Sequence, residues 1–146
     1  MKTDPFPKWM DLLGENLVEN GLMEEKPDQC IINEYLPGQG ISRHIDCVPC
    51  FGDRIVSISL LSGCVMEFQR YEEVQELYLE PRSLVLLTGD ARYKWTHCIP
   101  ARKFDGARER VRRISLTFRN VIIVEKHSGL GRSGRRHGTG SFIVQR

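Results

Sequence analysis

The chain has 146 residues, the length of one domain, and its composition of 40% hydrophobic and 27% charged residues excludes disordered, collagen-like and coiled-coil proteins. It has no apolar run of the roughly 20 residues that span a bilayer, and residues 1–9 lack the apolar core of a secretory signal. We therefore expect a cytoplasmic protein, or a nuclear one in a eukaryote, that is neither secreted nor bound to a membrane. The same absence of an export signal predicts that the five cysteines stay reduced.

The predicted elements begin with a helix over residues 7–21, where four apolar residues between 12 and 18 recur near helical spacing and Gly21 ends the pattern. Short strands are predicted after it, over 30–36, 42–46, 55–60, 64–68, 76–79, 83–87, 93–99, 113–119 and 121–124. Eight or nine short strands behind one helix predict a mainly β fold of the sandwich, barrel or jelly-roll type, with its core over about 28–124.

The net charge of +2 is unevenly distributed along the chain. The segment 125–146 has five basic residues against one acid, which gives +4 and leaves −2 for 1–124. Its glycines stand among arginines without an apolar period, so we predict a flexible basic tail behind a domain of 1–124. The tail and a second basic stretch, 102–113, suit a nucleic-acid partner, with phosphate contacts expected from Arg102, Lys103, Arg108 and Arg110.

A candidate metal site begins with His44 and Asp46, which are one residue apart and would share a face of a strand. His97 is the natural third ligand, because the two other histidines, His127 and His137, fall in the tail. Two histidines and one carboxylate form the facial triad of non-haem iron oxygenases, which leaves positions open for a cosubstrate and O₂. The alternative is a surface pair that binds nothing.

The strand over 113–119 places two arginines and two hydroxyl residues on one face: Arg113, Ser115, Thr117 and Arg119. Arginine on the inner face of a barrel is costly unless it meets an anion, and a guanidinium can hold a carboxylate with two hydrogen bonds. A dicarboxylate that also chelates iron would fit this pattern. The alternative is that this face is solvated and the apolar face points inward.

Three motifs in order resemble those of the AlkB-like Fe(II)- and 2-oxoglutarate-dependent dioxygenases. The first is the Asn-x-Tyr of Asn33 and Tyr35, followed by His44-Ile45-Asp46. The second, over 81–97, ends in Trp95-Thr96-His97, and the third, 113–119, is similar to the family's Arg-x-Asn-Leu-Thr-Phe-Arg. The resemblance covers about 28–121.

This resemblance implies a double-stranded β-helix, which is a jelly-roll-type fold, around an iron site formed by His44, Asp46 and His97. It implies that 2-oxoglutarate is bound by Asn33, Tyr35, Arg113, Arg119 and Ser115, the last standing where the family commonly has asparagine, with Arg113 on the distal carboxylate. The implied cofactors are Fe(II), 2-oxoglutarate and O₂. The implied reaction is oxidative dealkylation of alkylated bases in DNA or RNA, with the hydroxyalkyl product lost as an aldehyde.

Other functions stay open at this point. The same iron centre could hydroxylate a tRNA base modification or a protein side chain, and a truncated copy would be a non-catalytic binding module. Cys47-x-x-Cys50 lacks a second cysteine or histidine pair for zinc. We expect a monomer that binds nucleic acid.

Overall fold

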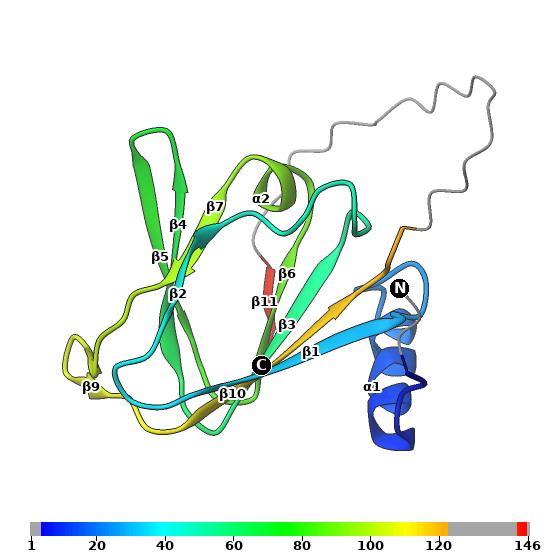
Figure 1. Cartoon of the computed structure of the whole chain (residues 1–146), viewed down its shortest axis with the longest axis horizontal. Coiled ribbons are helices and arrows are strands. Elements are labelled where there is room, and N and C mark those ends of the chain that lie inside the picture. Colours follow the sequence, from blue (N-terminus) through cyan, green and yellow to red (C-terminus); the bar gives the residue numbers. More distant parts are fainter. Residues whose placement is uncertain (1–3, 123–142, 146) are drawn as a thin grey trace.

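Two antiparallel sheets face each other in the structure, a computed structural model that describes residues 4–122 and 143–145 (Figure 1). Sheet A has the order β1 (Gln29–Tyr35), β10 (Arg113–Arg119), β3 (Ile55–Leu60), β6 (Ser83–Leu87) and β11 (Ile143–Gln145). Sheet B has the order β2 (Ile41–His44), β7 (Thr96–Ile99), β4 (Cys64–Arg70) and β5 (Glu73–Leu79). The arrangement is the predicted jelly roll.

The central strands of sheet A, β10, β3 and β6, are largely buried on both faces. Ile55 and Val85 point toward sheet B and join the core between the sheets, where Phe68 is also buried. Their chain neighbours Val56 and Leu86 point the other way into a second core. The two cores therefore follow from the alternation of side chains along β3 and β6.

The second core is closed by helix α1 (Lys8–Glu19), which lies against the outer face of sheet A (Figure 1). Met10 and Leu17 are its buried apolar residues, and Gly21 ends the helix with a positive φ of 71°. Phe6, just before the helix, packs edge-on against Phe118, with ring centroids 6.2 Å apart. The N-terminal helix is confirmed, and it covers the face of sheet A that points away from sheet B.

Three segments between residues 89 and 124 differ from the sequence prediction. The strand predicted over 93–99 is the short helix α2 (Gly89–Tyr93) followed by β7, because the amides of Lys94 and Trp95 both bond back to the Asp90 carbonyl. The strand predicted over 121–124 is a single bridge from Val121 to Phe51, with 123 and 124 outside the described residues. A hairpin, β8 (Phe104–Asp105) and β9 (Arg108–Glu109), was not predicted; its turn contains Gly106 at a φ of 61°.

The predicted flexible tail over 125–146 lies outside the described residues, except for 143–145, which form β11 beside β6. No helix within 4–122 is both long enough and apolar enough to cross a bilayer.

A buried ion pair holds the β8–β9 hairpin against the sheets. Asp105, 6% exposed, accepts two hydrogen bonds from Arg110, at 2.6 and 2.8 Å, and one from Arg102 at 2.8 Å. Burial alone would raise the pKa of Asp105, but these hydrogen bonds outweigh it and lower the pKa to about 2. Arg110 also donates to the Pro100 carbonyl at 2.7 Å, so this cluster ties β9 to the end of β7.

Asp105→Asn is expected to lower the free energy of unfolding by about 3–5 kcal/mol at neutral pH, because it leaves Arg110 buried without its counter-charge. The pKa of Asp105 falls from 3.8 to about 2 on folding, so its stabilising effect is complete above pH 3.8 and is lost as the pH falls toward 2. Denaturant titrations over a pH series should show the difference from wild type shrinking in acid. Glu109→Gln, an exposed change in the same hairpin, is the control.

Candidate active site

The three predicted metal ligands lie together between the sheets. The register pairs His44 of β2 with His97 of β7, and their ring centroids are 4.4 Å apart. Oδ1 of Asp46 is 3.5 Å from Nε2 of His44 and 3.7 Å from Nε2 of His97. One ligand atom from each residue lies within 4.8 Å of the other two, a separation that a single cation can bridge. Two imidazoles and a carboxylate suit a transition metal.

Asp46 reaches this site from outside any strand. The predicted strand 42–46 ends at His44, after a register irregularity between Ile41 and His44. The expectation that His44 and Asp46 share a strand face is therefore wrong, although both side chains reach the same place. The irregular segment 45–47 after β2 carries the carboxylate to the histidines.

The protonation of the two histidines follows from their surroundings. Nδ1 of His44 donates to the Ser42 carbonyl at 2.7 Å, which leaves Nε2 directed at Asp46. The hydrogen bond with Asp46 raises the pKa of His44. Burial, with the nearby His44, lowers the pKa of His97 to about 4, so this imidazole is neutral at neutral pH and offers a lone pair.

The carboxylate of Asp46 is ionised at neutral pH. Burial alone would raise its pKa, but the hydrogen bond from His44 and the electrostatic effect of His97 and Arg119 outweigh it and lower the pKa of Asp46 to about 2. A deprotonated carboxylate beside a neutral imidazole is the state in which both groups bind a metal ion.

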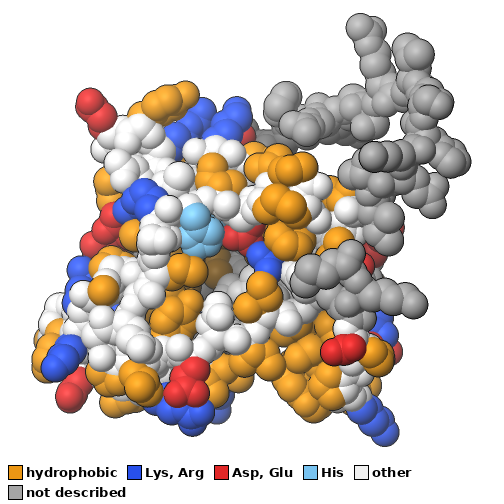
Figure 2. Space-filling view, viewed as in Figure 1, with side chains coloured by type: hydrophobic (Ala, Val, Ile, Leu, Met, Phe, Trp, Pro, Cys, Tyr) orange, Lys and Arg blue, Asp and Glu red, His pale blue; other side chains and the backbone are white. Residues whose placement is uncertain are grey.

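The residues predicted to bind the cosubstrate line the same cavity, of about 160 Å³, as the metal ligands. Strand pairing brings them together, since Asn33 and Tyr35 of β1 stand opposite Ser115 and Arg113 of β10. Arg113 and Ser115 are buried, so the solvated-face alternative for β10 is wrong. In Figure 2, a histidine and charged side chains of both signs surround a hollow in the surface.

Arg113 is 3% exposed, yet within the described residues its guanidinium has no carboxylate partner. Nη2 donates to the Ser59 hydroxyl at 2.8 Å, and Cζ lies 5.3 Å from the centre of the Tyr35 ring. Nε and Nη1 are buried and make no hydrogen bond there. A buried guanidinium with two free donors in a cavity could bind a carboxylate such as that of 2-oxoglutarate.

Arg119, at the other end of β10, is already engaged. Its Nη1 lies 3.2 Å from Oδ2 of Asp46, its Nε donates to Gln29 at 2.8 Å, and its guanidinium stacks on the Phe51 ring at 3.9 Å. Arg119 therefore stands beside the carboxylate of Asp46, while Arg113 lies at the opposite end of β10.

Some residues that contact the site were not predicted from the sequence. Ser59 lies on β3, and the β10–β3 register, which pairs it with Ser115, brings it within hydrogen-bond distance of Arg113. Gln29 and Arg92 also contact the site; Arg92 lies within the motif over 81–97, but no role was predicted for either residue.

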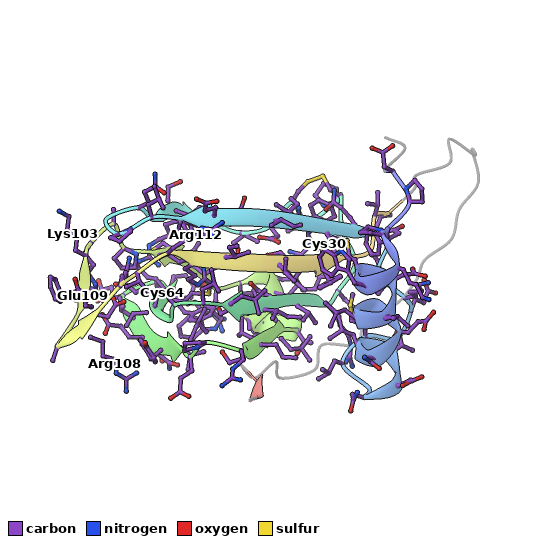
Figure 3. All side chains as sticks on the ribbon, turned by 90° about the horizontal axis from the view of Figure 1, so that it is seen from below. Cys30, Cys64, Lys103, Arg108, Glu109 and Arg112 are labelled. Carbon is purple, nitrogen blue, oxygen red and sulfur yellow. A yellow bond between two sulfur atoms is a disulfide. The ribbon has the colours of Figure 1, made fainter. Side chains whose placement is uncertain are left out.

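The expectation of reduced cysteines is wrong for one pair. Cys47 and Cys50 form a disulfide, because the turn that follows Asp46 brings their Cα atoms to 5.3 Å. Cys30, Cys64 and Cys98 are free, and burial raises the pKa of Cys30 to about 11. Cys64 belongs to the core between the sheets, and Cys30 packs against the second core (Figure 3).

The basic stretch 102–113 is only partly available to a polyanion. Arg110 is 6% exposed and bound to Asp105, so its prediction as a phosphate contact is wrong. Lys103, Arg108 and Arg112 remain exposed, the first two at the end of the molecule away from α1 (Figure 3). The tail arginines lie outside the described residues.

Comparisons with known proteins agree with this geometry. The family model of the 2OG-Fe(II) oxygenase superfamily matches residues 1–119. Uncharacterized protein L905 of Acanthamoeba polyphaga mimivirus is 42% identical over 124 residues, which are 80% of this chain and 59% of that protein. The mouse tRNA (carboxymethyluridine(34)-5-O)-methyltransferase ALKBH8 is 49% identical over 101 residues, 68% of this chain but only 15% of that protein.

The solved structure of OsALKBH1 matches 79% of this chain, and this chain covers 64% of it, with a TM-score of 0.59 and 20% identity, which shows a shared fold. The chain thus spans part of the length of each relative. The family implies Fe(II) and 2-oxoglutarate, and the cluster of His44, Asp46 and His97 and the two free donors of Arg113 fit both groups. This chain belongs to the 2OG-Fe(II) oxygenase superfamily and is similar to AlkB-like members of it.

Proposed function

We propose that this dioxygenase oxidises a carbon substituent on a base of RNA. The observation that supports this best is the sharing of one cavity by three convergent metal ligands and a buried guanidinium with two free donors. Iron and 2-oxoglutarate, when bound, supply the oxidation by O₂, with CO₂ and succinate as by-products. The fold itself is compatible with other substrates, so RNA rests on the similarity to a protein named for tRNA.

The chain's own residues would position the reactants. His44, Asp46 and His97 would hold iron, and Arg113 would bind the far carboxylate of 2-oxoglutarate through Nε and Nη1. The polar side chains of Asn33, Tyr35 and Ser115 would offer further hydrogen bonds along the same cavity. Ile55, Met66 and Leu87 supply an apolar wall that excludes water from the site.

Two outcomes of the oxidation are distinguishable. In oxidative dealkylation the substituent leaves as an aldehyde, whereas hydroxylation of a base modification leaves the new oxygen on the base. The second candidate is supported by the 49% identity to ALKBH8, which is named for a carboxymethyluridine in tRNA. Hydroxylation of a protein side chain is a further alternative.

The first experiment is an anaerobic titration of the metal-free chain with Fe(II) and 2-oxoglutarate, which separates an oxygenase from a binding module. The chain is then given O₂ and total tRNA or methylated RNA oligonucleotides. Nucleoside mass spectrometry and an assay for formaldehyde separate dealkylation from retained hydroxylation. Cosubstrate turnover that neither RNA set stimulates would contradict an RNA substrate.

RNA binding should depend on salt through the exposed basic residues at the β8–β9 end. Lys103→Ala is expected to lower the slope of log affinity against log salt concentration by about one unit, because each lost phosphate contact releases one fewer counterion. Oligonucleotide binding over a salt series measures the slope. Lys8→Ala, an exposed lysine at the start of α1, is the matched control with an unchanged slope. A flat salt dependence in the wild type would point to a protein or small-molecule substrate.

A further inference from the structure

The backbone of Asp46 is not part of any strand. β2 ends at His44, and residues 45–47 lie outside regular structure before a turn at 48–50. The ligand carboxylate is thus carried by a segment that the sheets do not hold in place. Some other contact must fix the Asp46 backbone if its carboxylate is to stay within 3.7 Å of both histidines.

Arg92 of α2 supplies that contact. It is 2% exposed, and its guanidinium donates to four backbone carbonyls. Nη1 bonds the carbonyl of Asp46 itself at 2.8 Å, and Nη2 bonds that of Cys47 at 3.2 Å. The other two acceptors, the carbonyls of Phe51 and Gly52, lie at 3.3 and 3.1 Å at the far end of the same segment.

The far end of this segment has anchors that do not involve Arg92. The Gly52 amide bonds the Asn120 carbonyl at 2.9 Å, and the Ile122 amide bonds the Cys50 carbonyl at 2.8 Å. The Cys47–Cys50 disulfide closes the turn between the two ends. At the Asp46 end, by contrast, the hydrogen-bond donor to the main-chain carbonyl within the described residues is Arg92.

We infer that Arg92 is a positioning residue for the metal site, which holds Asp46 in place through its main-chain carbonyl. An arginine suits this task because its planar fork can reach several carbonyls at once, whereas an ammonium group is a single point of attachment. Arg92 precedes the ligand His97 by five residues, so it also couples the segment leading into β7 to the Asp46 turn. This inference rests on the proposed metal site.

The test measures Mn(II) binding to the metal-free chain by calorimetry, together with the Tm of each variant. Arg92→Met, which keeps the length of the side chain and removes all donors, is expected to weaken the Kd for Mn(II) by about 10- to 100-fold, the usual effect of losing a residue that orients a metal ligand. Arg92→Lys is expected to recover part of the affinity. The rise in Tm on adding Mn(II) should shrink in the same order.

Arg110→Met is the matched control. It also removes a buried arginine, 6% exposed, that donates to a backbone carbonyl and to Asp105 in the β8–β9 hairpin. A purely structural role for Arg92 would make both variants lose Tm and neither lose Mn(II) affinity. The inference predicts a weakened Kd for the Arg92 variants alone. If Arg92→Met does not fold, Arg92→Lys decides, and a wild-type Kd in that variant would overturn the inference.

Asp46→Ala separates the two proposals. If the wild type binds Mn(II) and Asp46→Ala does not, the metal site is supported, whatever Kd the Arg92 variants show. Equal Kd values for wild type and Arg92→Met would then reject only the role of Arg92. A wild-type chain that binds neither Mn(II) nor Fe(II) would contradict both proposals.

Discussion

Asp46→Ala is expected to reduce 2-oxoglutarate turnover to background, and His44→Ala and His97→Ala are expected to do the same. Each change removes one of three ligands whose donor atoms lie within 4.8 Å of one another, and two remaining ligands cannot form the facial triad. Succinate formation from 2-oxoglutarate, measured with and without added Fe(II), gives the result. Anaerobic Fe(II) binding to the same variants shows whether the loss occurs at metal binding.

Asp53→Asn is the control for these three changes, because it removes an exposed carboxylate seven residues after Asp46 and outside the cavity. It should turn over 2-oxoglutarate like the wild type. Retained turnover in His97→Ala would reject His97 as the third ligand. Apart from His44, the remaining histidines of the chain are His127 and His137, which lie beyond the described residues.

Arg113→Ala is expected to raise the 2-oxoglutarate concentration needed for half-maximal turnover by about 10²- to 10³-fold. Leaving a carboxylate buried without its partner costs about 3–5 kcal/mol, and every 1.4 kcal/mol is about tenfold in affinity. Arg113→Lys should restore part of the loss, because an ammonium group cannot make the two-pronged contact. Calorimetric binding of 2-oxoglutarate to the metal-loaded chain measures the effect apart from turnover.

Arg112→Ala is the matched control, because this neighbouring arginine is exposed and paired with Glu34. Its requirement for 2-oxoglutarate should not change. The Tm without ligand adds a second criterion: removing Arg113, a buried charge with two free donors, should not destabilise the fold. A large fall in Tm with normal 2-oxoglutarate binding would instead make Arg113 a structural residue.

The clustering of His44, Asp46 and His97 could be predicted because their chemistry is local and their number is small. A His-x-Asp pair and one remaining histidine outside the tail leave little choice, and the resemblance in three ordered motifs fits the order of these residues along the chain. The alternation in 113–119 placed Arg113 and Ser115 on one face, but it left open whether that face is buried, which the structure shows. These features survived errors in the elements themselves, such as the predicted strand over 42–46.

Other parts of the site depend on tertiary contacts that leave no periodic pattern. Arg92 is one of 21 basic residues, and only the fold shows that it bonds the Asp46 carbonyl. Arg110 looked like a surface charge because counting charges cannot tell a solvated arginine from one paired with a buried aspartate. The Cys47–Cys50 disulfide likewise depends on a local turn. The prediction of reduced cysteines had considered only the expected cellular compartment.

The two strands that carry Arg113 and His44 differ in how many neighbouring strands they pair with. β10, which carries Arg113 and Arg119, is paired along its length with β1 and, over most of it, with β3. β2, which carries His44, is an outer strand of sheet B and pairs with β7 through an interrupted register. The free energy of the local opening that permits amide exchange is lowest in short strands that are paired on one side. In a central strand it approaches the free energy of global unfolding. We therefore expect β2 to open more readily than β10, and a metal held by His44 and His97 would fasten the outer strand of sheet B to its neighbour.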